Sequence, residues 1–353
     1  HSLGDTRLFQ LAVDTSAHPW LADQRTHGRQ FVPSTFYMDW AWQIARLVFG
    51  DGPVTISNFA LYRTVEVGSE AAENLQLALD PAGESAAFRI SAREEDGSWT
   101  VLCDGQLAKA ASAPDALPDA PMTDAEVAPF YARLGELGLD FGPSFRALET
   151  LQSGDGAASA TVSGGDGTGH MAHPAVLDSA LHVIGAALPL DTLTTPYMVF
   201  AADEIAWHGP LAGRFRSDAA IAGTPGDDTL SAEVRLTSET GAPLVSLSGV
   251  TLRRASAAAF TDSGAKGLFY RPVWRRDAAP AAPERLGAET LPAMAELAGE
   301  ASLETTYGDF LKGLDAVSAA YVAQALRTLG APLAEGDALT ADGLMGTAGI
   351  DPR

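Results

Sequence analysis

HPWLADQRTHGRQFVP, residues 18–33, places Gln24 four residues before Gly28 and ends in Pro33, where an apolar helical pattern begins. An imidazole at position 24 would titrate near neutral pH and serve as a general base. The carboxamide of Gln24 donates and accepts hydrogen bonds without changing its charge. Position 24 therefore carries a polar side chain that takes up no proton near neutral pH.

The pattern after this stretch predicts a long buried helix followed by strands. The spacing predicts a helix over residues 34–49, with Ser34 as its N-terminal cap. One stripe of this helix carries Phe36, Trp40, Ile44 and Leu47. Alternation with a period of two then predicts strands at residues 75–79, 88–91 and 99–102.

The same order of elements returns in the second half of the chain. Helices are predicted at residues 124–137 and 175–188, and strands at residues 158–162, 230–236 and 243–249. The helices predicted at 34 and 175 begin roughly 140 residues apart, as expected of a duplicated unit. Each unit is predicted to wrap an antiparallel sheet about one helix, which makes the fold class α+β.

Composition limits the classes of function. The 353 residues carry a net charge of −22, which disfavours binding to nucleic acid or to an anionic membrane. Cys103 is the single cysteine, so an intramolecular disulfide and a four-cysteine zinc site are excluded, and no spacing of histidines indicates another metal site. No apolar window is long enough for a membrane span, and no glycine-rich nucleotide motif occurs. We expect a globular protein of the cytoplasm.

Four segments resemble the dehydratase domains of modular polyketide synthases and follow the order that this family has. They are HSLG at residues 1–4, the stretch at residues 20–33, GLDFGPSF at residues 138–145 and HPAVLDSALH at residues 173–182. The family pattern H-x-x-x-G-x-x-x-x-P has its base histidine at the position of Gln24, and Leu139 and Phe141 replace family tyrosines. The resemblance covers roughly residues 1–275 and implies a double hot-dog fold.

The resemblance also implies a reaction and a set of site residues. The family removes water from a β-hydroxyacyl thioester that arrives on the phosphopantetheine arm of an acyl carrier protein, and it needs no cofactor of its own. Asp178 is implied as the acid, assisted by His182, with Gln24 in place of the base. The substrate pocket implied by the same segments comprises Gly28, Pro33, Leu139, Phe141, Gly142 and Pro143, with His27 beside it.

Gln24 leaves the activity open. Loss of a positioned general base typically costs about 10²–10⁴ in rate, so ordinary dehydration is expected to be impaired. The site is then silent, or it serves another reaction such as double-bond isomerisation, ring closure by conjugate addition or Michael-type branching. Two further alternatives are a non-catalytic scaffold and a dehydratase rescued by His27, which requires a turn to redirect that side chain.

The predicted organisation is an N-terminal hot-dog at residues 1–113, a linker at 114–126, a C-terminal hot-dog at 127–254, a linker at 255–290 and a helical extension at 291–353. The extension resembles, more loosely, the start of a C-methyltransferase domain. The start without methionine suggests a segment of a longer polypeptide. The implied partners are an acyl carrier protein, neighbouring synthase domains and a second copy in a homodimer.

Overall fold

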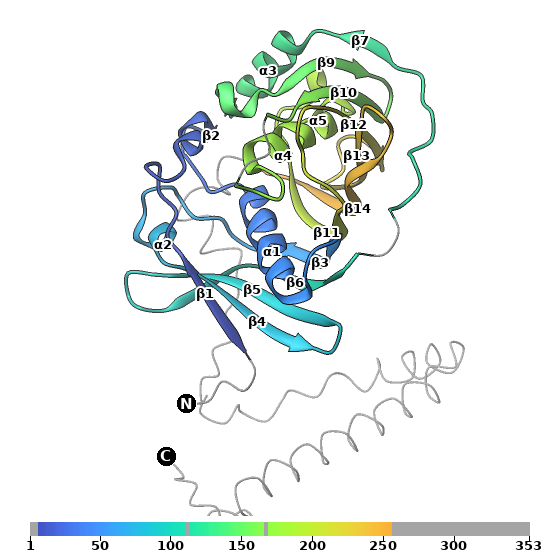
Figure 1. The fold of residues 1–353 in the computed structure, drawn as a ribbon. Helices are drawn as coiled ribbons and strands as arrows, with labels where there is room; N and C mark the ends of the chain where they lie inside the picture. Colours follow the sequence, from blue (N-terminus) through green and yellow to red (C-terminus); the bar gives the residue numbers. More distant parts are fainter. Residues whose placement is uncertain (1–5, 111–112, 166–168, 256–353) are drawn as a thin grey trace, which may run out of the picture. The chain divides into compact units, whose positions relative to one another are not determined.

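The structure is a computed structural model that describes residues 6–110, 113–165 and 169–255, drawn in colour in Figure 1. The HSLG segment at residues 1–4 lies outside the described residues. The helical extension predicted at residues 291–353 lies outside them as well, as does the linker predicted at 255–290 apart from its first residue.

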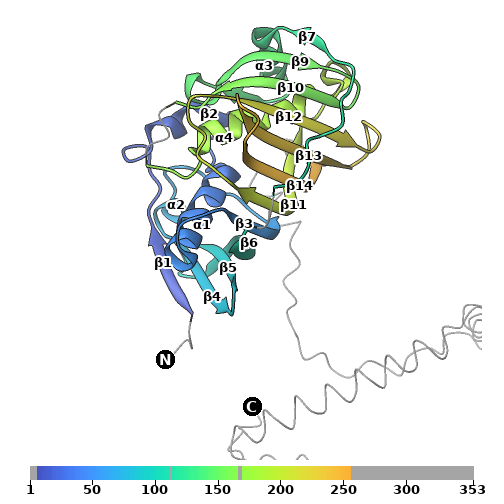
Figure 2. The same ribbon diagram turned by 45° about the vertical axis from the view of Figure 1, so that its right-hand side comes forward.

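A single antiparallel sheet of twelve strands runs through the described part of the chain. Its first half has the order β1-β4-β5-β6-β3 and its second half the order β11-β14-β13-β12-β10-β9-β7. The strands of the first half are β1 (Arg7–Leu11), β3 (Val54–Leu61), β4 (Leu75–Ala82), β5 (Ser85–Arg93) and β6 (Trp99–Lys109). Those of the second half are β7 (Thr123–Ala125), β9 (Leu148–Ser153), β10 (Ala157–Ser163), β11 (Tyr197–Trp207), β12 (Arg214–Ala222), β13 (Thr229–Ser238) and β14 (Pro243–Arg254). Pairing of β3 with β11 joins the halves into one continuous sheet (Figure 2).

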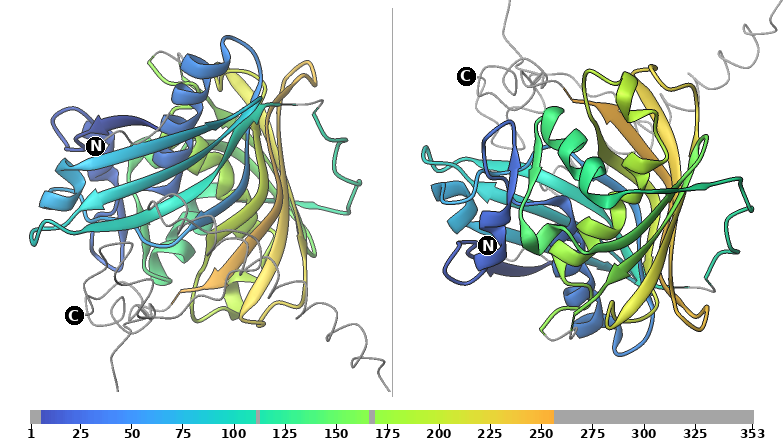
Figure 3. Two further views of the ribbon diagram at one scale, coloured as in Figure 1. Left: turned by 90° about the horizontal axis from the view of Figure 1, so that it is seen from below. Right: turned by 90° about the horizontal axis from the view of Figure 1, so that it is seen from above.

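Each half of the sheet curves around a helix, as Figure 3 shows from two sides. α1 (Ser34–Phe49) packs against β3 and β6. α4 (Pro174–Leu181) and α5 (Val183–Ala186) pack against β10, and α5 also contacts β12. α1 and α4 contact each other, so the central helices of the two units meet. This arrangement is a double hot-dog and confirms the predicted α+β class.

Alternation along the strands accounts for the core of the first unit. Leu75, Leu77 and Leu79 of β4 are buried, as are Phe88 and Ile90 of β5, because alternate side chains of a strand point to the same face. They belong to the apolar core that also contains the buried side of α1. The predicted strands at 75–79, 88–91 and 99–102 all lie within β4, β5 and β6.

α1 has the predicted bounds but differs from the prediction in two details. Pro33, with extended backbone angles, occupies the N-cap position, so Ser34 is already helical and makes no capping bond. The prediction of Ser34 as the cap is therefore wrong. Phe36, Trp40 and Ile44 are buried as predicted, whereas Leu47 in the last turn is 74% exposed.

The second unit departs from the prediction at both of its helices. The helix predicted at residues 124–137 is α3 (Val127–Glu136), because residues 123–125 pair with β9 as strand β7. This strand lies inside the stretch predicted as a linker at 114–126. The helix predicted at 175–188 is divided at His182 into α4 and α5. None of the helices in the described ranges has the length and apolar character that crossing a membrane requires.

Candidate active site

A small sheet brings two sequence motifs together. β2 (Gln24–Thr26) pairs antiparallel with β8 (Leu139–Phe141), so that Gln24 lies opposite Phe141 and Thr26 opposite Leu139. Alternate residues of a strand share a face, and these four side chains all line one cavity of about 1100 Å³. The stretch at residues 18–33 and the GLDFGPSF segment thus build one wall together.

The loop after β8 is fixed to the residue before β2. The Gly142 amide donates to the Asp23 carbonyl, and the Ser144 amide and hydroxyl donate to Asp23 Oδ2 at 2.9 and 2.6 Å. A Cβ at position 142 would lie 2.8 Å from Asp23 Cγ, so only glycine permits this approach. Gly142 and Pro143 were predicted as pocket residues; neither is among the residues that line the cavity.

His27 and Gly28 form the tight turn that follows β2. Both have positive φ, 49° and 78°, and the Thr26 amide donates to the Arg29 carbonyl across the turn at 2.8 Å. The His27 amide donates to the Gly138 carbonyl at 2.7 Å, and the His27 ring lies against Gly138. If His27 is to replace the missing base, a turn must redirect its side chain, and that turn is present. However, neither His27 nor Gly28 is among the residues that line the cavity.

Gly138→Ala is expected to destabilise the protein by about 1–3 kcal/mol, because the backbone there has φ +86° and a Cβ would lie 2.2 Å from His27 Nδ1. Urea unfolding of the whole chain measures the loss. Gly83→Ala is the matched control, since Gly83 also has positive φ but has open space around it. In a His27→Ala background, Gly138→Ala should lower the free energy of unfolding only as much as Gly83→Ala does. If Gly138→Ala and Gly83→Ala cost the same in the wild-type background, the close packing of His27 on Gly138 is refuted.

Gln24 presents its carboxamide to the cavity from β2. Its Oε1 atom is buried and has no hydrogen-bond partner among the described residues. A buried acceptor without a donor costs free energy, and this oxygen has almost no accessible surface. Gln24 thus contributes a polar side chain to the cavity wall.

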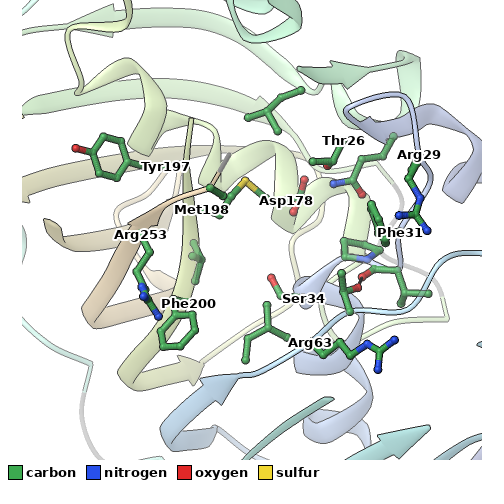
Figure 4. Close-up of a pocket in the computed structure, with 18 of the residues that line it drawn as sticks. Thr26, Arg29, Phe31, Ser34, Arg63, Asp178, Tyr197, Met198, Phe200 and Arg253 are labelled. Atoms are coloured by element: carbon green, nitrogen blue, oxygen red, sulfur yellow. Dashed lines mark hydrogen bonds between the residues drawn. The ribbon is translucent and has the colours of Figure 1, made fainter. Parts of the chain in front are cut away.

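Asp178 and His182 face the same cavity from the second unit. They lie one turn apart at the end of α4, and His182 Nε2 is 3.3 Å from Asp178 Oδ2. Their side chains are 17% and 9% exposed. Asp178 is the fifth residue of α4, beyond the first turn in which the helix dipole acts. Figure 4 shows Asp178 between the side of the cavity with Thr26 and the side with Met198.

Two aromatic rings pack against the imidazole of His182. The Phe141 ring centroid lies 4.1 Å from that of His182, and Tyr131 meets the ring edge-on at 5.6 Å. The Tyr131 hydroxyl is 3.3 Å from His182 Nδ1. Burial raises the pKa of Tyr131 above its usual value, so the hydroxyl keeps its proton. The sequence did not single out Tyr131, because its place in an amphipathic helix predicts only burial.

Asp39 of α1 is a second residue that sequence reasoning missed. Its Oδ1 accepts from the Met171 and Ala172 amides at 2.9 and 3.0 Å, and its Oδ2 lies 2.6 Å from His170 Nδ1. Residues 170–172 directly precede α4, so this buried carboxylate ties α1 to the segment that leads to Asp178. An aspartate within the apolar stretch YMDWAW was the available signal.

The rest of the cavity lining is mostly apolar and also includes arginines and glutamates. Pro33 lines it as predicted, and α5, β11 and β14 add apolar residues that include Ile184, Leu188, Met198, Val199 and Leu252. Arg63 ion-pairs with Glu94, whereas the Arg253 guanidinium stacks on the Phe200 ring at 4.6 Å. The cavity can thus hold a long apolar group beside a small polar centre.

Two family models match the chain. "Polyketide synthase dehydratase domain" matches residues 1–93, and "Polyketide synthase dehydratase N-terminal domain" matches residues 108–262. The spectinabilin polyketide synthase system protein NorB of Streptomyces orinoci is 29% identical over 77% of this chain and 13% of NorB. Polyketide synthase GfsE of Streptomyces halstedii is 28% identical over 74% of this chain and 7% of its own length. The chain therefore spans a small part of these relatives.

Solved structures show the same fold. The dehydratase domain from the CurF module of curacin polyketide synthase has a TM-score of 0.64 at 20% identity, over 72% of this chain and 96% of that domain. The dehydratase domain of PpsC from Mycobacterium tuberculosis has a TM-score of 0.63 at 23% identity, over 73% and 96%. Two inactive mutants of the CurK dehydratase, with TM-scores of 0.64, replace a histidine by phenylalanine and an aspartate by asparagine. With matches to family models in both halves of its double hot-dog, this chain belongs to the dehydratase domain family of polyketide synthases.

Proposed function

We propose that this domain is a dehydratase-like unit of a modular polyketide synthase that binds β-hydroxyacyl or α,β-unsaturated thioesters of an acyl carrier protein and is impaired in removing water. The observation that carries the proposal is the carboxamide of Gln24 in the wall of the cavity that also holds Asp178 and His182. A carboxamide does not accept a proton near neutral pH. The CurK mutants, inactive after loss of a histidine or of an aspartate, support a two-residue requirement in this family.

His182 does not replace the missing base. Elimination needs an acceptor for the α-proton and a separate donor for the departing hydroxyl. His182 is the imidazole in the described cavity lining, and both of its ring nitrogens are engaged, with Asp178 and with Tyr131. His182 therefore acts together with Asp178 as part of the acid, and it does not act as the base.

The cavity favours substrate binding over a purely structural role. A scaffold needs no interior space, whereas small-molecule sites have cavities of about 300–1,000 Å³ with a few polar groups. This cavity has about 1100 Å³ and a polar centre at Gln24 and Asp178. The alternative of a non-catalytic scaffold is therefore the weaker one.

A repurposed catalyst is the second candidate function, and the polar side chain of Gln24 in the same cavity as Asp178 favours it. The carboxamide can orient a thioester carbonyl or an enolate through hydrogen bonds, and Asp178 can still transfer a proton. Conjugate addition, ring closure and double-bond isomerisation all use such a pair. Rescue by His27 is less favoured, since its ring packs on Gly138 outside the described lining.

Wild-type protein incubated with a β-hydroxyacyl carrier-protein thioester is expected to show no loss of water by mass spectrometry. A parallel incubation with an α,β-unsaturated thioester reports isomerisation or conjugate addition, and it separates the repurposed catalyst from the impaired dehydratase. Asp178→Asn is the control, since either activity should fall with loss of the acid. Rapid water loss by wild type that His27→Ala abolishes would refute the proposal and establish rescue.

The partners follow from the same proposal. The curated relatives are polyketide synthase proteins of which this chain covers a small part, which supports neighbouring synthase domains in one polypeptide or assembly. An acyl carrier protein would present the substrate on its phosphopantetheine arm. A homodimer, a C-methyltransferase domain beginning near residue 291 and a cytoplasmic location are further proposals, each based on the resemblance to modular synthases.

A further inference from the structure

We propose that Tyr131 is a positioning residue that keeps a proton on His182 Nδ1, so that the Asp178–His182 pair holds one transferable proton between its facing atoms. The placement of that proton is a property of the folded chain alone. Only its use as the acid in catalysis rests on the proposed function.

Three contacts share hydrogen atoms: Tyr131 with Phe145, Tyr131 with His182, and His182 with Asp178. The Tyr131 hydroxyl lies 3.3 Å from the Phe145 carbonyl oxygen and 3.3 Å from His182 Nδ1. A hydroxyl has one hydrogen to donate, and a carbonyl can only accept. When Tyr131 donates to Phe145, its oxygen is left to accept a hydrogen bond from His182 Nδ1–H, and both contacts are satisfied.

Burial makes this arrangement the favoured one. Tyr131 and Phe145 are both buried, so a Phe145 carbonyl that lost the hydroxyl would have little access to water, and an unpaired buried acceptor is costly. The Phe141 ring packs at a tilt against His182, with 4.1 Å between the ring centroids. If Tyr131 instead donated to His182 Nδ1, the contact between Tyr131 and Phe145 would join two acceptors.

The proton count of the pair follows from the third contact. With hydrogen on Nδ1, a neutral imidazole directs the lone pair of Nε2 toward Asp178 Oδ2, which is 3.3 Å away. An ionised carboxylate would repel that lone pair, so a proton must lie between the two atoms. The pair is then a neutral acid beside imidazole, or a carboxylate beside imidazolium, and both forms hold the same number of protons.

This proton is the one that dehydration requires. Its transfer to the β-oxygen of a β-hydroxyacyl thioester accompanies cleavage of the C–O bond, and the hydroxyl leaves as water. The α-proton must leave to a separate base as the double bond forms, and in this chain the Gln24→His variant would supply that base. The base then releases its proton to solvent and the Asp178–His182 pair takes one up, which restores the starting state.

Histidine ¹⁵N NMR tests the proposal directly, because the two ring nitrogens have different shifts when protonated. In wild-type protein with ¹⁵N-labelled histidine, His182 is expected to show a protonated Nδ1 at neutral pH; the His182→Gln variant assigns its signals among the seven histidines. In Tyr131→Phe, which retains the ring but lacks the hydroxyl, His182 should change to the form protonated on Nε2 alone. Asp178→Asn should keep the Nδ1 proton, because its amide can donate to Nε2.

Tyr197→Phe is the matched control. Tyr197 lines the cavity that His182 faces, but its hydroxyl donates to the Asp227 carbonyl, so its loss should leave the His182 signals unchanged. A wild-type His182 protonated on Nε2 alone, or an unchanged pattern in Tyr131→Phe, would overturn the proposal. The spectra do not depend on any turnover, so failure of the proposed function would appear separately, as absence of activity on either thioester.

Discussion

Gln24→His is expected to raise the rate of water loss from a β-hydroxyacyl carrier-protein thioester by about 10²–10⁴, the typical contribution of a positioned general base. Gln24 lies on β2 opposite Phe141 and lines the cavity with Asp178. An imidazole there would therefore have the acid of the second unit within the same cavity. Mass spectrometry of the bound acyl chain over time measures the gain.

Two companion variants decide whether the gain arises for this reason. Gln24→Met keeps the length of the side chain without its hydrogen bonds, and it should show no increase in water loss. Gln24→His combined with Asp178→Asn should lose most of the gain, since a base without an acid leaves the hydroxyl a poor leaving group. If Gln24→His dehydrates no faster than Gln24→Met, then position 24 is not what limits the reaction.

Local patterns predicted the fold because its long elements follow from burial. The apolar stripe of residues 34–49 gave α1 its bounds, and alternation located β4 and β5. Residues 123–125, Thr-Asp-Ala, contain no large apolar side chain, and they form strand β7 because they pair with the edge of β9. No local pattern contains that pairing, and the helix was therefore predicted to start too early.

The residues of the candidate site also fall into those that local motifs predict and those that depend on distant partners. Gln24, Asp178 and His182 were predicted from motifs, and the structure brings all three to one cavity. Tyr131 and Asp39 were missed because their partners are 51 and 131 residues away, at His182 and His170. For His27, sequence reasoning identified that a turn is needed to redirect the side chain. It could not predict that the ring packs on Gly138.

Asp39→Ala is expected to lower the free energy of unfolding by about 3–5 kcal/mol, the usual effect of removing one partner from a buried charged network. The Asp39 side chain is 3% exposed and accepts from His170 and from the Met171 and Ala172 amides. Its removal would leave these donors buried without an acceptor. Urea unfolding followed by tryptophan fluorescence measures the loss.

The control is Asp51→Ala, two residues after the end of the same helix. Asp51 pairs with Arg46 but is 87% exposed, so its loss should cost less than about 1 kcal/mol. Equal costs at the two positions would contradict the role given to Asp39. Asp39→Asn, which keeps one acceptor oxygen, should fold more stably than Asp39→Ala. When Asp39→Asn is combined with Gln24→His, dehydration should still be slower than with Gln24→His alone. Asp39 holds residues 170–172, which lead directly into α4, and so helps to position Asp178 relative to residue 24.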